Sequence, residues 1–392
     1  MRSGIHLVKG RCPRQAHTSL KDLGDLVEDE LGRNGFLGRV AELYRKHSPI
    51  EWTRQEGNYR GWDLSGLALV PSDQGDPNGT PLKLFYNDDV SIWVSRRSEA
   101  MPFAFRNVDG DEVYFVHEGT GVFDTEFGPI PYEPGDWVVI PKSTTYRVIP
   151  DGATNYFLII EAVDEVVFPD FAARGLGRHV PFDPTAIFVP EPKEAAQEET
   201  QVSTGEWQVR LKHSGEYSSL FYPFDPMDVV GWKGDLFPFK LNIRDYRTVM
   251  SDRIHLMPTS DAVFQAKGFI IINRVPRPAE RDPEAERLPP YHRNADYDEF
   301  LFTHSGSFYG AKLEPASISF QPQGLHHGFP KAHREELKRK WREHESLDRT
   351  FVSIDISRPL KITDDAKAAS RKSIRVKDAA GKQDSKDSLP AR

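Results

Sequence analysis

One stretch of the chain occurs twice, and it decides the fold. FRNVDGDEVYFVHEG, residues 105–119, is matched by HRNADYDEFLFTHSG, residues 292–306, with Arg, Asn, two Asp, Glu, Phe, His and Gly at identical offsets. The match resumes where EPGDWVVIPKSTTY, residues 133–146, aligns with EPASISFQPQGLHH, residues 314–327. Length differences fall between these segments, where a hairpin can absorb them. Such self-similarity indicates one β-rich unit that is used twice.

The local patterns predict strands rather than long helices. Short apolar runs such as 113–116, 137–140 and 156–160 are bounded by Gly, Pro, Asp or Asn, as strands of a barrel or sandwich are. The 30 Pro and 29 Gly indicate many turns. Residues 20–44 have apolar positions at roughly helical spacing, interrupted by glycines, and predict at most short helices. The charged stretch 331–349 predicts an exposed helix.

Composition excludes several classes of protein. A length of 392 residues with 24 Phe supports two folded cores, and a net charge of −8 argues against a general nucleic-acid binder. A single cysteine, Cys12, excludes an internal disulfide framework and a cysteine-cluster metal site, whereas 13 His make imidazole the ligand to expect. The N-terminus lacks an apolar signal segment, and no run is long enough to span a membrane. We therefore expect a cytoplasmic protein that does not bind membranes.

The predicted division of the chain follows from the repeat and from composition. Residues 190–206 are polar and acidic, which indicates a linker. We expect a first, metal-free domain over 1–189 and a second domain, with a metal site, over 207–360. Residues 361–392 carry many charges and few aromatic residues, which predicts a disordered tail.

The two copies differ where metal chemistry would require it. Both keep a glutamate, as Glu112 and Glu299, but only the second copy has His292 and His327, at positions where the first has a Phe and a Tyr. Two imidazoles and one carboxylate form the set that binds non-haem Fe(II) and leaves other positions open. Features shared by both copies are expected to be architectural, and features confined to the second copy functional.

Other polar residues of the repeat favour structural roles. His117 and His304 occur in both copies, five residues after the Glu, on the opposite face of a strand. His326 competes with His327 as a ligand, but the spacing from the preceding Pro aligns His327 with Tyr146. The repeated aspartates are expected in turns: Asp109, Asp111, Asp296 and Asp298.

Each copy resembles a cupin, a jelly-roll β-barrel, through a His, a later Glu, a Gly and a closing Pro–His segment. More specifically, the second half resembles the homogentisate 1,2-dioxygenase family. The matching text is DVVGWKGD (228–235), FPFKLN (237–242), PYHRN (290–294), EF (299–300), YGAK (309–312) and HG (327–328). The resemblance implies a mainly β protein of two cupin domains with few short helices.

The resemblance also implies residue roles. His292, Glu299 and His327 would be the ligands of Fe(II). His255 matches a family histidine that handles a substrate hydroxyl proton, as a neutral imidazole can. Tyr309 aligns with an active-site tyrosine, as a catalytic and substrate-binding residue.

The implied reaction is opening of a para-dihydroxylated aromatic acid by O₂, with homogentisate converted to maleylacetoacetate in tyrosine and phenylalanine catabolism. Gln321 stands where the family has a second histidine, and it is a candidate for substrate binding. It keeps gentisate or a substituted hydroquinone open as substrates. A non-catalytic bicupin, or a Zn²⁺ or Mn²⁺ enzyme, is the alternative of a different class, because ligand type alone does not fix the metal. The family also implies a homo-oligomer built from trimers.

Overall fold

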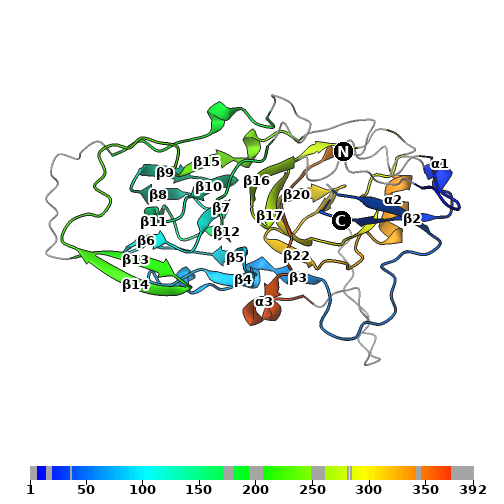
Figure 1. The fold of residues 1–392 in the computed structure, drawn as a ribbon, viewed down its shortest axis with the longest axis horizontal. Helices are drawn as coiled ribbons and strands as arrows, with labels where there is room; N and C mark the ends of the chain where they lie inside the picture. The colour runs from blue at the N-terminus through cyan, green and yellow to red at the C-terminus, as the bar shows by residue number, and fades with distance from the viewer. Residues whose placement is uncertain are drawn as a thin grey trace.

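The computed structural model describes most of the chain, namely residues 7–14, 20–35, 38–170, 180–193, 206–248, 261–279, 282, 285–340 and 346–371. Two β-barrels lie side by side in it (Figure 1). The α-helices of this part of the chain are short: α1 (Leu20–Leu23), α2 (Lys331–Arg339) and α3 (Asp364–Ala368). The mainly β expectation is confirmed. None of the described helices is long and apolar enough to cross a membrane.

The first barrel is built from two sheets. The larger has the order β15 (Phe239–Asn242), β10 (Asp136–Ile140), β7 (Asp111–Glu118), β12 (Tyr156–Ala162), β5 (Val90–Ser95), β4 (Leu82–Tyr86) and β25 (Lys361–Ile362). The smaller has the order β14 (Glu216–Tyr222), β13 (Trp207–His213), β6 (Ala104–Asn107), β11 (Thr145–Pro150), β8 (Gly121–Thr125) and β9 (Gly128–Tyr132).

The second barrel repeats this plan. Its larger sheet has the order β16 (Ala262–Ala266), β17 (Phe269–Arg274), β24 (Arg349–Ile356), β20 (Asp298–Phe308), β22 (Ser317–Gln321) and β3 (Trp62–Ser65), with β21 (Ala311–Lys312) beside β20. Its smaller sheet has the order β19 (Tyr291–Asn294), β1 (Val27–Gly32) and β2 (Val40–Arg45). A short pair, β18 (Arg277–Pro278) and β23 (Ser346–Leu347), lies beside them.

Each barrel is completed by a hairpin from the other predicted domain. The β13–β14 hairpin adds to the first barrel, where β13 runs parallel to β6 and pairs Lys212 with Asn107. The β1–β2 hairpin adds to the second barrel, where β1 runs parallel to β19 and pairs Gly32 with Asn294. Because Asn107 and Asn294 are equivalent in the repeat, these exchanged hairpins occupy equivalent places.

The exchange corrects the expected domain ranges. Strands within 27–65 belong to the second barrel and strands within 207–242 to the first, so the ranges 1–189 and 207–360 do not match the sheets. Residues 20–44 hold one short helix and then strands, whereas a short helix begins the 331–349 stretch as expected. Tail residues 361–371 form β25 and α3, so disorder was the wrong expectation there. Residues 194–205 of the expected linker and 372–392 of the tail lie outside the described residues.

The repeated aspartates fasten the exchanged hairpins. The Asp109 carboxylate accepts backbone hydrogen bonds from Ser214 and Gly215, at the turn of the β13–β14 hairpin, the latter at 2.9 Å. In the other copy Asp296 accepts one from Asn34, at the turn of the β1–β2 hairpin, at 2.6 Å. Asp109 and Asp296 lie in bends, as expected, whereas Asp111 and Asp298 are the first residues of β7 and β20, so the expectation of turn residues was wrong for that pair.

Replacing Asp109 with alanine is expected to loosen the β13–β14 hairpin. Two backbone N–H groups lose a charged acceptor, which costs about 1–3 kcal/mol of the free energy of unfolding. Urea denaturation measures this cost, and limited proteolysis within 206–222 reports local opening. Asp88→Ala is the matched control, because that side chain is 87% exposed. Equal stabilities for the two variants would contradict this role of Asp109.

The larger sheets of the two barrels pack face to face, and strand alternation positions the site. Phe300 and Phe302 of β20 point into a shared core, with the Phe300 ring 5.6 Å from Phe85 of the first barrel. The alternate residues Glu299 and Leu301 face the interior of the second barrel, where they line a cavity. The strand that carries the carboxylate is therefore fixed by packing on its other face.

Candidate metal centre

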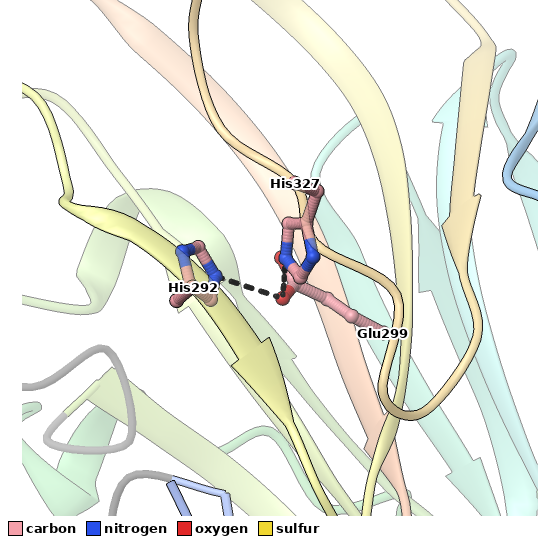
Figure 2. Close-up of side chains that lie close together, drawn as sticks. All are labelled: His292, Glu299 and His327. Atoms are coloured by element: carbon pink, nitrogen blue, oxygen red, sulfur yellow. Dashed lines mark hydrogen bonds and ion pairs between the residues drawn. The ribbon is translucent and has the colours of Figure 1, made fainter. Parts of the chain in front are cut away.

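Three predicted ligands converge inside the second barrel (Figure 2). His292 comes from β19, Glu299 from β20, and His327 from the segment after β22 that forms a single bridge with His292. The Nε2 atoms of His292 and His327 lie 3.7 and 3.2 Å from Glu299 Oε2. One ligand atom from each residue lies within 4.8 Å of the others. The structure thus brings together side chains from three separate segments of the second barrel.

Backbone carbonyls orient both imidazoles. His292 Nδ1 lies 3.0 Å from the Pro290 carbonyl oxygen, and His327 Nδ1 lies 3.0 Å from that of Leu325. A hydrogen on each Nδ1 satisfies these carbonyls and directs the Nε2 lone pairs toward Glu299. Two nitrogen lone pairs and a carboxylate then face one another, an arrangement that a cation stabilises. The donor set therefore fits a divalent metal that accepts nitrogen and oxygen ligands.

In the first barrel, the equivalent glutamate, Glu112, has hydroxyl groups instead of imidazoles beside it. Glu112 accepts a hydrogen bond of 2.7 Å from the Tyr146 hydroxyl, which is 2.6 Å from the Tyr114 hydroxyl. Burial, reinforced by Glu161, raises the pKa of Glu112 to about 7. Burial also acts on Glu299, but the neighbouring imidazoles of His292 and His327 outweigh it and hold the pKa of Glu299 well below its ordinary value. The second barrel alone is built to keep this carboxylate charged.

The triad opens into a cavity of about 380 Å³. Apolar side chains of Leu301, Phe308, Phe329 and Phe351 form part of its wall. Gly32 of the β1–β2 hairpin lines this cavity. It pairs with Asn294, as Lys212 of the β13–β14 hairpin pairs with the equivalent Asn107 in the first barrel. The corresponding space of the first barrel measures only about 40 Å³ and has Lys212 in its wall. A missing side chain at residue 32 therefore contributes to the room beside the triad.

The other candidate residues have different positions. Gln321 lies opposite Glu299 in the strand register and lines the cavity, with its amide donating to Ser319 Oγ at 3.2 Å. The Tyr309 hydroxyl donates to the Arg287 carbonyl oxygen at 2.9 Å, and Tyr309 is not among the residues that line the cavity. The His326 Nε2 lies 3.2 Å from Asp29, so its ring points away from the triad. His255 lies outside the described residues.

Three cavity residues escaped prediction. Arg274 at the end of β17, Arg277 in β18 and Arg349 at the start of β24 all line the cavity. Asp355 of β24, opposite Glu299 in the register, is buried behind it. The signal for Arg349 and Asp355 lies in the last strand of the repeat, where the first copy has Asn155 and Glu161.

The chain is similar to several known proteins. A family model described as the homogentisate 1,2-dioxygenase N-terminal region matches residues 82–243. A protein of Saccharolobus solfataricus with a provisional dioxygenase name is 29% identical over 82% of this chain and 85% of its own length. Homogentisate 1,2-dioxygenase of Pseudomonas entomophila is 27% identical over 84% of this chain and 70% of its own length. Homogentisate 1,2-dioxygenase of rice, Oryza sativa, is 30% identical over 56% of this chain and 46% of its own length.

Solved structures add a cupin barrel protein of Leptotrichia buccalis, with a TM-score of 0.37 and 9% identity over 75% of this chain and 95% of that one. The chain spans about half the length of several of the homogentisate 1,2-dioxygenases it matches, for example 55% of the Pseudomonas putida enzyme. The family model falls on the first barrel and the strands that complete it, and the longer matches extend over both barrels. Over these stretches, the chain is similar to homogentisate 1,2-dioxygenases.

Proposed function

We propose that the protein is an Fe(II)-dependent dioxygenase that opens the ring of a para-dihydroxylated aromatic acid, with homogentisate as the first candidate. The observation that carries the proposal is the convergence of two imidazole nitrogens and one carboxylate on a cavity that can admit an aromatic ring. Similarity to homogentisate 1,2-dioxygenases supports ring cleavage by O₂ as the reaction.

His292, Glu299 and His327 would hold the metal, whose contribution when bound is to bring both reactants together and transfer electron density between them. The protein's own part is positional. Carbonyl acceptors at Pro290 and Leu325 fix the imidazole orientation, and Glu299 supplies the negative charge. The apolar wall around Phe308 and Phe351 limits water near the reacting ring.

A second candidate is the same chemistry on gentisate or a substituted hydroquinone. Gln321 favours this second candidate, because it differs from the histidine of the family. An amide next to the triad can hydrogen-bond a hydroxyl or carboxylate of the substrate but cannot carry a proton. A Zn²⁺ or Mn²⁺ enzyme has the same ligand types available.

Anaerobic loading with Fe(II), followed by O₂ electrode measurements, tests the proposal. We expect one O₂ consumed per homogentisate, with maleylacetoacetate detected by its ultraviolet absorbance, and slower uptake with gentisate. Parallel loading with Zn²⁺ is the control and should give no uptake. Absence of oxygen consumption with every dihydroxylated aromatic acid would refute the dioxygenase proposal.

A further inference from the structure

The cavity that contains the triad is also lined by Arg274, Arg277 and Arg349, which form no ion pair with any residue that the structure describes. Arg349 is 7% exposed, and its Nη1 has no hydrogen-bond partner in the part of the chain that the structure describes. Its guanidinium lies 5.1 Å from the Phe308 ring and 5.6 Å from the Phe351 ring. A buried cation with an unused donor costs free energy unless an anion reaches it. Arg349 is thus a candidate anion-binding residue.

Two further arginines strengthen the positive charge. Arg274 and Arg277 line the same cavity, and burial, reinforced by these two charges, lowers the pKa of Arg349 to about 9. Among described residues neither forms an ion pair, and Arg274 donates only to Ser353 Oγ, at 3.1 Å. Tyr309 and, to a smaller extent, Asp261 act on the pKa of Arg349 in the opposite direction, and Asp261 accepts a hydrogen bond of 2.7 Å from Thr248. The carboxylates among the lining residues of the cavity are Glu30, Glu42, Asp261 and Glu299.

Arg274 and Arg349 are not among the features that the two copies of the repeat share. The register of the last strand against the Glu-bearing strand places Arg349 at the position of Asn155, and Arg274 at the position of Ser95. Both counterparts are neutral and hydrogen-bonded, Asn155 to the Tyr132 hydroxyl at 2.9 Å and Ser95 to Asp73 at 2.5 Å. Like the two ligand histidines, Arg274 and Arg349 occur only in the barrel with the open cavity.

We propose that Arg349, with Arg274 and Arg277, binds the carboxylate of an aromatic acid whose ring lies between these arginines and the His292–Glu299–His327 triad. The inference rests on the proposed function for the position of the ring and adds the residues that select an acid. Guanidinium groups bind carboxylates through paired, charge-assisted hydrogen bonds. The Tyr309 hydroxyl, which donates to the Arg287 carbonyl, takes no part in this assignment.

The test measures binding and needs no turnover. Isothermal titration of the Zn²⁺-loaded, full-length protein uses phenylacetate, its neutral counterpart phenylacetamide, and inorganic phosphate. For the unmodified protein we expect phenylacetate to bind at least tenfold more tightly than phenylacetamide. Arg349→Met should weaken phenylacetate binding at least tenfold and leave phenylacetamide unchanged. Arg54→Met removes the same charge from a side chain that is 69% exposed and should change neither.

Two further variants, Arg274→Met and Arg349→Lys, test the inference in case Arg349→Met does not fold. The first should weaken phenylacetate binding and the second should retain part of it, with melting temperatures as the check. Equal binding of acid and amide by the unmodified protein would overturn the inference, as would unchanged phenylacetate binding in Arg349→Met and Arg274→Met. Phosphate that binds more tightly than phenylacetate would also overturn it, in favour of a free-anion site. None of these outcomes depends on oxygen consumption, so failure of the dioxygenase proposal would be seen separately.

Discussion

Replacing His292 with alanine is expected to abolish stoichiometric Fe(II) binding and to lower oxygen uptake by at least about a thousandfold. The variant removes one of two imidazole donors and leaves His327 and Glu299, which cannot by themselves hold the ion in the same place. Loss of metal-assisted stabilisation of the transition state, several kcal/mol, accounts for the size of the effect. Metal content by mass spectrometry and oxygen uptake with homogentisate measure the two quantities.

His326→Ala is the matched control for this prediction. That histidine adjoins His327 in sequence, yet its side chain lies 3.2 Å from Asp29 and points away from the triad. The control should bind one Fe(II) per chain. A ligand that binds only the folded state stabilises it, so added metal should raise the melting temperature of the control and not that of His292→Ala. Stoichiometric iron in His292→Ala would refute the ligand assignment.

The repeat made the β-rich fold and the convergence of the triad predictable. Because a strand alternates its side chains between two faces, equal offsets in two copies place Glu112 and Glu299 on equivalent interior positions. The difference between the copies then marked His292 and His327. The structure brings these two residues onto Glu299, and metal binding by them remains a prediction until tested.

The exchanged hairpins could not be predicted in the same way. The sequence of a short strand such as β1 does not indicate which strand it pairs with. Its parallel pairing with β19 joins residues about 260 positions apart. Residues 27–32 read VEDELG, with three consecutive charged positions that interrupt any apolar alternation. Their burial depends on partners from the second barrel, which only the tertiary structure supplies.

The arginines of the cavity were not predicted from the sequence for a related reason. Arg274 and Arg349 lie at strand ends, where a charged residue ordinarily signals solvent. The burial of Arg349 results from a cavity wall that includes Phe308 and Phe351, and Arg274 is half-buried in the same wall. Comparing the last strands of the two copies shows the change from Asn155 to Arg349, but its meaning depends on the position of β24 next to β20.

Between the two barrels, His117 and His304 form a contact that is expected to make the protein sensitive to acid. Their Nδ1 atoms lie 3.0 Å apart, at equivalent positions of the two copies, among the rings of Phe115, Tyr156 and Phe302. Burial, together with the neighbouring imidazole, lowers the pKa of His117 to about 3, and burial lowers that of His304 to about 4. Both residues are therefore neutral in the folded protein at pH 5 and protonated to a large extent when it is unfolded.

The free energy of unfolding should accordingly be fully present above pH 6.5 and decrease as the pH falls toward 4. Each histidine contributes up to about 1.4 kcal/mol per pH unit below 6.5, so the pair should cost about 2–4 kcal/mol at pH 5. Urea denaturation at pH 7.5, 6.5, 5.5 and 5.0 measures this loss. The double variant His117→Gln, His304→Gln should show a shallower dependence over this range. Glu112, with its pKa raised to about 7, acts in the opposite direction but is present in both proteins, so the difference between them isolates the histidines. Parallel pH profiles for the two proteins would show that the buried pair does not govern acid stability.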